Sequence, residues 1–245
     1  MDYPPSRFLR HLEATMAAQS SGVGTTRPLD LSLYVILDRD FTAGRALAEV
    51  ATAAIRGGAT ALQLRDKSSD LHRFYADATE LLAIARAAGV PLIVNDRVDV
   101  ALAVGADGVH VGEDDVPVEA ARRLVGPDRF VGASAGSVAA ARAAIAAGAD
   151  HLGVGPVYEA RATKTDAGPP VGLTLVRDIA AFSPLPIVGI GGITAENASA
   201  VIAVGAAGVA VISAIGLAPD VEAATRLLAQ SVGAMLESPS LGGRQ

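Results

Sequence analysis

The sequence contains no cysteine and no tryptophan, and aromatic residues make up only 4% of its 245 residues. Without cysteine the chain can form neither a disulfide nor a thiolate metal site, a composition that is compatible with the cytoplasm, where we expect the protein to act. No apolar stretch reaches about 20 residues without a polar interruption, so we expect no membrane span. The opening stretch also lacks the unbroken apolar run of a signal peptide.

Positive charge is scarce as well. The chain has 20 Lys and Arg residues against 26 Asp and Glu residues, which gives a formal net charge of −6 at pH 7. Such a chain has no general electric field that attracts phosphate backbones, so we predict that nucleic acid is not a partner. Any anion must be bound by a local group of side chains, which favours small-molecule partners.

Small and aliphatic residues are abundant: 51% of the residues are hydrophobic and 26 are glycine. This composition is typical of a sheet that is covered by helices. The length fits one domain, which we place at residues 29–235. We expect residues 1–28 to form a short helix and a flexible linker rich in Ser, Gly and Thr, and residues 236–245 to form a flexible tail.

An internal repeat predicts the fold. Four Gly-Ala pairs each follow an Ala-rich helical stretch and open a short apolar run, at Gly58, Gly105, Gly148 and Gly205. Glycine after a helix allows the left-handed conformation of a C-cap, after which the chain enters a strand. Four further apolar runs lie between these pairs, at residues 33–37, 91–94, 130–133 and 186–190.

Eight strands alternating with helices, such as those expected at residues 71–88 and 138–147, indicate parallel pairing with right-handed crossovers. We therefore predict a single-domain α/β fold, the (β/α)8 TIM barrel, with an open doubly wound sheet as the alternative. A dinucleotide-binding fold is disfavoured, because no G-x-G-x-x-G follows the first strand.

In a TIM barrel the active site lies at the carboxyl ends of the strands, so reactive side chains are sought there. The expected strand ends carry Asp38, Gln63, Arg65, Lys67, Asn95, Asp96, His110, Asp115, Ser134, Thr163, Lys164, Gly191, Gly192, Ile212 and Ser213. Of these, His110 is more typical of a packed, hydrogen-bonded histidine than of a catalyst, and Asp38 can be a turn residue only.

The second strand places two cations and an amide on one face. Alternation puts Gln63, Arg65 and Lys67 together, where Arg65 can donate two hydrogen bonds to a diphosphate and Lys67 can add a point charge. The alternative is a surface ion pair between Asp66 and Lys67, which is worth ~0 to 1 kcal/mol.

Two carboxylates end the neighbouring third and fourth strands. Asp96 and Asp115 form a hard-oxygen pair that suits Mg²⁺, which keeps several waters and binds substrate phosphate oxygens. The alternative is that Asp96 caps the following helix and that Asp114 and Asp115 are solvated loop acids.

The last two strand ends suggest a phosphate site. Gly191 and Gly192 let backbone N–H groups approach an anion beside Ser213, as loops after strands seven and eight do in many barrels; a tight turn is the alternative. Lys164 lies in a long polar segment, residues 159–170, which we interpret as a substrate loop, the alternative being a solvent-exposed loop.

Six stretches together resemble the thiamine-phosphate synthase family, in the right order over residues 31–218. They are Gln63-Leu-Arg-Asp-Lys67, Val94-Asn-Asp-Arg-Val-Asp-Val-Ala-Leu-Ala-Val-Gly-Ala-Asp-Gly-Val-His110, Gly112-Glu-Asp-Asp115, Gly153-Val-Gly-Pro-Val-Tyr158, Thr163-Lys164 and Val188-Gly-Ile-Gly-Gly-Ile193.

The resemblance implies Mg²⁺-dependent coupling of hydroxymethylpyrimidine diphosphate with thiazole phosphate, through a dissociative, carbocation-like step. It implies that Gln63, Arg65, Lys67 and Asn95 hold the pyrimidine diphosphate, that Asp96 and Asp115 bind Mg²⁺, and that Lys164 touches the diphosphate. It also implies that Ser134 lies near the reacting pyrimidine, and that Thr163, Gly192, Ile212 and Ser213 hold the thiazole phosphate. In this interpretation Arg65, Lys67, Ser134 and Lys164 are the catalytic residues.

The chain departs from the family pattern at three places. One is the segment Glu159-Ala-Arg-Ala-Thr-Lys164, where Arg161 can replace a missing threonine. The others are Glu113 and the residues after Ser134. A thiazole tautomerase-like barrel and a non-catalytic phosphate-binding protein are the competing functions. Neither needs the diphosphate and metal residues, which argues against both. The sequence is compatible with a homo-oligomer and does not define the number of subunits.

Overall fold

The computed structural model describes residues 29–67, 70–160 and 169–236. The expected N-terminal helix and linker lie outside these ranges, as do nearly all of the expected tail and the segment that carries Arg161, Thr163 and Lys164. The domain boundaries therefore stay predictions. Among the described helices, none is both long and apolar enough to cross a membrane.

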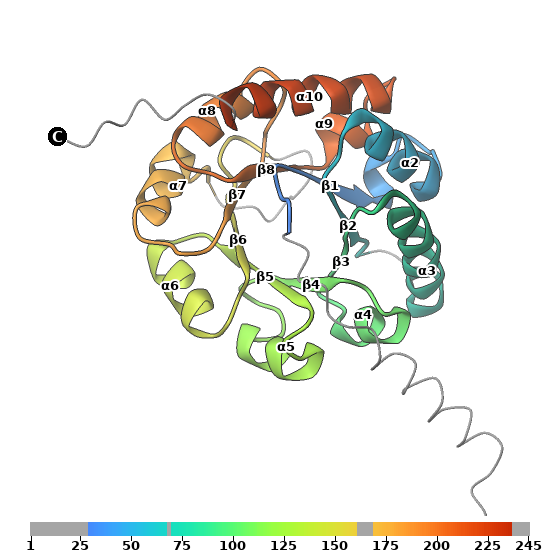
Figure 1. Cartoon of the computed structure of the whole chain (residues 1–245), viewed down its shortest axis with the longest axis horizontal. Coiled ribbons are helices and arrows are strands. Elements are labelled where there is room, and N and C mark those ends of the chain that lie inside the picture. Colours follow the sequence, from blue (N-terminus) through green and yellow to red (C-terminus); the bar gives the residue numbers. More distant parts are fainter. Residues whose placement is uncertain (1–28, 68–69, 161–168, 237–245) are drawn as a thin grey trace, which may run out of the picture.

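Eight parallel strands form a closed barrel (Figure 1). They are β1 (Leu33–Asp38), β2 (Ala61–Arg65), β3 (Leu92–Asn95), β4 (Gly108–Val111), β5 (Phe130–Ala135), β6 (His151–Val154), β7 (Ile187–Ile190) and β8 (Gly208–Val211). The barrel closes where β1 pairs with β8, with Leu33 opposite Val209. This pairing confirms the predicted (β/α)8 barrel and excludes the open-sheet alternative.

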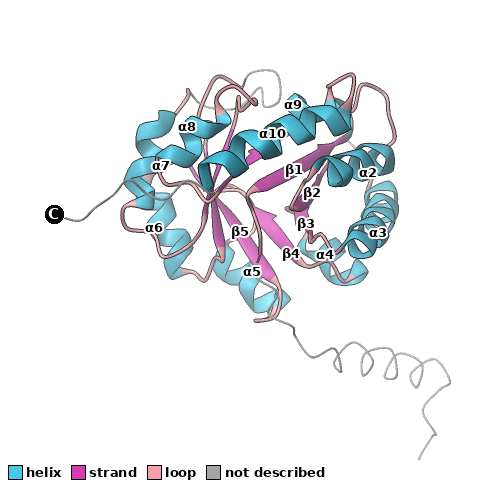
Figure 2. Ribbon diagram, turned by 45° about the horizontal axis from the view of Figure 1, so that its top comes forward, coloured by secondary structure: helices cyan, strands magenta, loops and turns pink. Residues whose placement is uncertain are grey.

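Helices surround the barrel on the outside (Figure 2). They are α2 (Leu47–Gly57), α3 (Leu71–Ala88), α4 (Val98–Val104), α5 (Val118–Val125), α6 (Val138–Ala146), α7 (Gly172–Ala180), α8 (Ala198–Ala203), α9 (Ser213–Gly216) and α10 (Val221–Leu236), with a 3-10 turn η1 (Arg39–Phe41) after β1. The long helix α3 has the bounds that its sequence pattern predicts.

The Gly-Ala pairs end helices as expected. Gly58 is the C-cap of α2 with a φ of 106°, and its N–H donates to the carbonyl oxygens of Ala54 and Ile55. A side chain is disfavoured in this left-handed conformation, which explains why glycine occupies the position. The chain then turns directly into β2.

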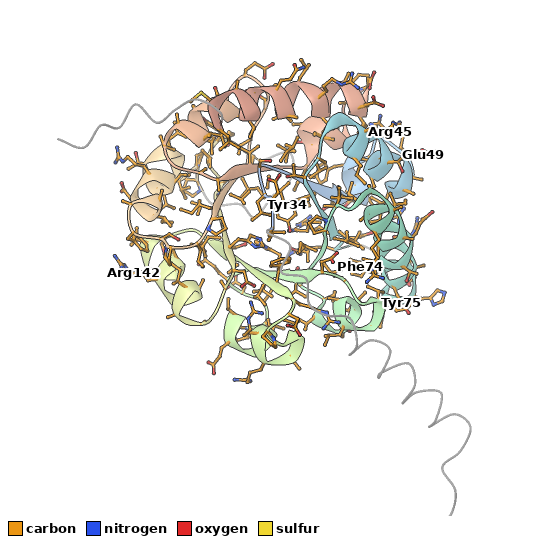
Figure 3. The ribbon with its side chains drawn as sticks, in the orientation of Figure 1. Tyr34, Arg45, Glu49, Phe74, Tyr75 and Arg142 are labelled. Carbon is orange, nitrogen blue, oxygen red and sulfur yellow. The ribbon has the colours of Figure 1, made fainter. Side chains whose placement is uncertain are left out.

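The alternation of side chains along the strands divides the core in two. Outward-facing residues such as Leu62 and Leu64 pack between strands and helices, whereas a smaller cluster that includes Tyr34 and Ile93 fills the barrel interior. Tyr34 lies inside the ring of strands (Figure 3). Above this cluster the inward-facing positions become polar.

The strand register brings those polar positions to one height. Asp38 on β1 is opposite Arg65 on β2, and Asn95 on β3 is opposite His110 on β4. Each of these residues lies at or near the carboxyl end of its strand, which is where barrel enzymes carry their active sites.

Candidate active site

One cavity of about 980 Å³ opens at the carboxyl ends of the strands. Every described residue that the sequence predicts for the site lines it: Gln63, Arg65, Lys67, Asn95, Asp96, Asp115, Ser134, Gly192, Ile212 and Ser213. These residues come from six strand ends, so the fold brings them together although 150 residues separate the first from the last. Thr163 and Lys164 lie outside the described residues.

The two acids form a close pair on one side of the cavity. Burial raises the pKa of Asp96 to about 6, reinforced by the hydrogen bond and the negative charge of Asp115, while the charges of Lys67 and Arg65 act in the opposite direction. The carboxyl of Asp96 is thus disfavoured as an anion, mainly by burial and further by the nearby Asp115. A bound cation would favour the charged form of both acids.

The backbone conformation of Asp96 also argues against a purely structural role. Its φ is 59°, in the left-handed region that non-glycine residues rarely adopt and that often marks functional positions. Helix α4 starts at Val98 with Arg97 as its N-cap and with no capping hydrogen bond from a side chain. The alternative interpretation of Asp96 as a helix cap is therefore wrong.

The donor set fits magnesium better than a transition metal. Within the described ranges, no group of three or more His, Cys, Asp or Glu side chains is arranged to hold an ion. Mg²⁺ commonly uses only one or two protein carboxylates and takes its other ligands from water and substrate phosphates. Asp96 and Asp115 match that requirement.

Cationic groups lie beside the acids at the rim. The Arg65 guanidinium forms an ion pair through Nη1 with Oδ2 of Asp38, and Arg65 lines the cavity together with Lys67. Asp66 forms an ion pair with Arg39 at 3.4 Å. This contact differs from the alternative interpretation, in which Asp66 pairs with Lys67. Among the described residues Lys67 has no ion-pair partner.

Beneath the rim, Ser134 contacts a pair of buried histidines. Nε2 of His110 lies 3.2 Å from Oγ of Ser134, and the ring centroids of His110 and His151 are 5.6 Å apart. Burial lowers the pKa of His110 to about 4 and that of His151 to about 3, the latter also through the charge of His110. Both rings are therefore neutral near pH 7.

Glycine makes room for these rings. A Cβ atom at Gly132 would lie 2.5 Å from Nδ1 of His110 and would overlap the His151 ring. The sequence prediction treated His110 as packed and hydrogen-bonded, which the contact with Ser134 confirms, but it missed His151 and Tyr34. Their inward-facing positions on β6 and β1 were the available signal.

The opposite wall is built from small residues at the ends of β7 and β8. Gly191 and Gly192 have φ values of 97° and 65°, and a Cβ at Gly192 would lie 2.6 Å from the carbonyl oxygen of Glu159. Asn197 fixes this turn by donating from Nδ2 to the carbonyl oxygen of Gly192 at 3.0 Å. Ser213 begins α9 directly after β8. The structure therefore shows a tight turn at this wall of the cavity.

The departure at Glu113 has a structural role. Its Oε1 accepts a hydrogen bond from the backbone N–H of Gly136 at 2.6 Å, joining the loop after β4 to the loop after β5. The loop that carries Asp115 is thereby tied to the strand that carries Ser134.

Comparison with known proteins agrees with this geometry. Residues 33–215 match the family model described as "Thiamine monophosphate synthase". The chain is 50% identical to the thiamine-phosphate synthase of Roseiflexus sp. (strain RS-1) over 211 residues, which cover 86% of this chain and 89% of the relative. It is also 50% identical to that of Natronomonas pharaonis over 204 residues, 83% of this chain and 95% of the relative.

A solved structure supports the same assignment. The thiamine phosphate pyrophosphorylase from Pyrococcus furiosus superposes with a TM-score of 0.78 at 40% sequence identity, over 85% of this chain and 98% of that one. The match covers nearly the whole barrel in sequence and in space. The chain is therefore an enzyme, a transferase that belongs to the thiamine monophosphate synthase family.

Proposed function

We propose that the enzyme couples hydroxymethylpyrimidine diphosphate with thiazole phosphate in the presence of Mg²⁺, giving thiamine phosphate and diphosphate. The observation that carries the proposal is the meeting of two acids, Asp96 and Asp115, with two cations, Arg65 and Lys67, at the rim of one cavity. Acids alone would repel a diphosphate, and cations alone would not hold a metal. Together they suit a metal diphosphate.

Asp96 and Asp115 would hold the Mg²⁺ ion. When bound there, the ion would neutralise charge on the diphosphate and complete its coordination with water and phosphate oxygens. The raised pKa of Asp96, caused by burial and by the nearby Asp115, supports this assignment, because a divalent cation would stabilise both charged carboxylates.

The chain's cations would stabilise the leaving group. As the bond between the pyrimidine methylene and the diphosphate breaks, its electron pair stays on the diphosphate oxygen. Arg65, Lys67 and Lys164 donate hydrogen bonds to the growing negative charge, a type of stabilisation worth several kcal/mol in preorganised sites. The thiazole nitrogen then supplies the electron pair of the new C–N bond, so no side-chain nucleophile is needed.

The polar layer below the rim would orient the pyrimidine. Gln63 donates from Nε2 to the hydroxyl of Tyr34 at 2.8 Å, which leaves its amide oxygen to accept from the pyrimidine amino group. Asn95 lines the same cavity from β3, and Ser134, which contacts the neutral His110, would lie close to the reacting carbon. Fixed hydrogen bonds of this kind favour the geometry in which the two reactants meet.

The small-residue wall would bind the second substrate. Gly192, Ile212 and Ser213 would accept the thiazole phosphate through backbone N–H groups and the Ser213 hydroxyl, with Thr163 as a further ligand. The two anionic groups would then enter opposite sides of the cavity. Both substrates are small molecules, and we propose that the enzyme meets them in the cytoplasm.

The test is incubation of the purified protein with both substrates and Mg²⁺, followed by mass detection of thiamine phosphate and diphosphate in equal amounts. Omission of either substrate or addition of a chelator should abolish product. Conversion of the thiazole phosphate alone would support the tautomerase alternative, and binding without any conversion would support the phosphate-binding alternative.

A further inference from the structure

A buried acid lies behind the arginine of the diphosphate site. Asp38 ends β1, is only 3% exposed and does not line the cavity, whereas Arg65, opposite it on β2, does. Oδ2 of Asp38 forms an ion pair with Nη1 of Arg65. The guanidinium therefore has one side turned to a buried carboxylate and another side turned to the cavity.

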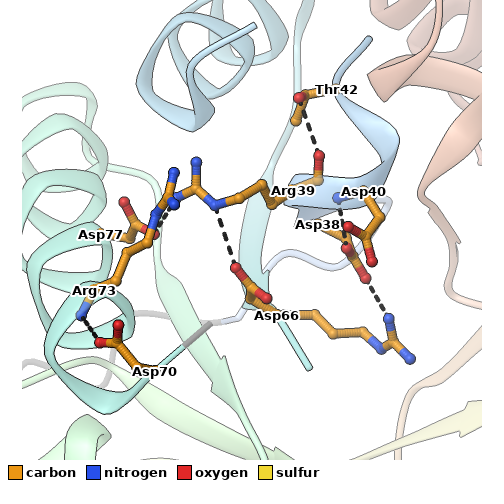
Figure 4. Close-up of polar contacts among 9 residues, drawn as sticks. Asp38, Arg39, Asp40, Thr42, Asp66, Asp70, Arg73 and Asp77 are labelled. Atoms are coloured by element: carbon orange, nitrogen blue, oxygen red, sulfur yellow. Dashed lines mark hydrogen bonds and ion pairs between the residues drawn. The ribbon is translucent and has the colours of Figure 1, made fainter. Parts of the chain in front are cut away.

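The Asp38 carboxylate is itself held in place. Its other oxygen, Oδ1, accepts a hydrogen bond from the backbone N–H of Asp40 at 3.1 Å, which starts the η1 turn (Figure 4). Burial raises the pKa of Asp38, and the charge of Arg65 lowers it. A buried carboxylate with both oxygens in fixed contacts cannot move with a flexible side chain, so it defines where Arg65 points.

A second set of ion pairs fixes the turn from outside. Arg39 pairs with Asp66, which follows β2, and with Asp77 on α3 (Figure 4). Arg39 does not line the cavity. These ion pairs join the η1 turn to the end of β2 and to α3, next to the Asp38 pair, but they do not involve Arg65. They therefore serve as a control for the loss of a neighbouring ion pair.

We propose that Asp38 is the positioning residue of the diphosphate site: it fixes the Arg65 guanidinium so that its remaining N–H groups point at the anion. Arginine has five N–H donors in a planar fork, so one edge can bind Asp38 while the rest bind phosphate oxygens. The identity of the anion as a diphosphate rests on the proposed function.

The test is decided by whether anion binding becomes tighter or weaker in the variant. Asp38→Asn removes a negative charge next to an anion site, so a purely electrostatic effect would tighten anion binding. Loss of positioning weakens it instead, by about tenfold when one charge-assisted hydrogen bond is lost. Inorganic diphosphate is the probe, and its Kd is measured by calorimetry with Mg²⁺ for the wild type, Asp38→Asn and Asp77→Asn.

We expect Asp38→Asn to weaken diphosphate binding about tenfold, with the KM for the pyrimidine diphosphate rising and the KM for the thiazole phosphate unchanged. Asp77→Asn should leave the Kd of diphosphate and the KM of the pyrimidine diphosphate at wild-type values. In an Arg65→Gln background, Asp38→Asn should have no further effect. Tighter or unchanged binding in Asp38→Asn, an equal effect of Asp77→Asn, or an additive effect in the Arg65→Gln background would overturn the proposal.

If Asp38→Asn does not fold, Arg65→Lys provides a separate test. Lysine keeps the charge but has no planar fork, so it cannot bridge Asp38 and the anion in the same geometry. We expect Arg65→Lys to lose a similar amount of diphosphate affinity. An affinity equal to that of the wild type would overturn the proposal. So would the finding that the wild-type protein binds no diphosphate. A protein that binds diphosphate but forms no thiamine phosphate would refute the proposed function and leave the Asp38 result intact.

Discussion

The burial of Asp96 beside Asp115 predicts that one substitution stabilises the fold while it removes activity. In Asp96→Asn, the ionisable group with the raised pKa is replaced by a neutral amide of the same shape. Asparagine also tolerates the left-handed backbone, with its φ of 59°, that Asp96 adopts. The change therefore removes the cost of a buried carboxylate, and its repulsion by Asp115, without adding backbone strain.

The magnitude follows from the pKa. A rise from 3.8 to about 6, at about 1.4 kcal/mol for each pKa unit, corresponds to about 3 kcal/mol for a fully buried acid. Because Asp96 is partly exposed and shares its proton with Asp115, we expect a gain of about 1 to 2 kcal/mol in the free energy of unfolding. For a chain of this length that raises Tm by roughly 3 to 6 °C.

The stabilisation by Asp96→Asn depends on pH. The folded chain holds the Asp96 proton more tightly than the unfolded chain does, so wild-type stability falls as pH rises from about 4 to about 6 and the penalty is complete above that range. Thermal unfolding in a chelator should thus show a higher Tm for Asp96→Asn at pH 8, with the difference shrinking as pH falls from 6 towards 4.

The control is Asp99→Asn on the same segment. Asp99 pairs with Arg97 at 2.6 Å, and the hydrogen bond from Arg97 lowers its pKa, so its loss should leave Tm unchanged or slightly lower. Mg²⁺ should raise the Tm of the wild type but not that of Asp96→Asn, and coupling activity should be lost in that variant. An unchanged or lower Tm for Asp96→Asn at pH 8 would refute the argument that the buried Asp96 carboxylate destabilises the fold.

Three further outcomes are expected. Gly132→Ala should lower the free energy of unfolding by about 1 to 3 kcal/mol in urea because its Cβ would overlap the His151 ring, whereas Gly233→Ala on α10, which meets nothing within 4 Å, should be neutral or slightly stabilising; equal effects would contradict the packing account. Ser213→Ala should raise the KM for thiazole phosphate and leave that for the pyrimidine diphosphate unchanged, and an unchanged thiazole phosphate KM would count against the hydroxyl's role. The acid limb of kcat/KM should move to lower pH as Mg²⁺ concentration rises, since metal and proton compete for Asp96; a limb that stays fixed would separate the metal from this carboxylate.

Much of the fold could be predicted because helix ends and strand starts are local features. The Gly58 C-cap and the bounds of α3 depend only on neighbouring residues, and alternation along β2 places Gln63 and Arg65 towards the cavity. Eight such units favour a closed barrel, and the pairing of β1 with β8 decides against the open sheet.

The missing parts depend on contacts between distant segments. Asp38 reads as a turn residue until the register of β1 and β2 sets it against Arg65. Likewise, the His151 ring can be placed only once Gly132 on the neighbouring strand is known to leave room for it. The left-handed backbone of Asp96 and the bond from Gly136 to Glu113 arise from loop geometry, for which the sequence has no simple periodic signal.

The central claim is that acids and cations at one rim gather a divalent ion and a diphosphate together. Its most direct test is the Kd of inorganic diphosphate, measured by calorimetry with and without Mg²⁺ in the wild type and in Asp96→Asn. We predict that Mg²⁺ tightens diphosphate binding to the wild type and, reciprocally, that diphosphate tightens Mg²⁺ binding, and that both effects disappear in Asp96→Asn. Diphosphate binding that is independent of Mg²⁺, or a coupling that persists in Asp96→Asn, would contradict the account.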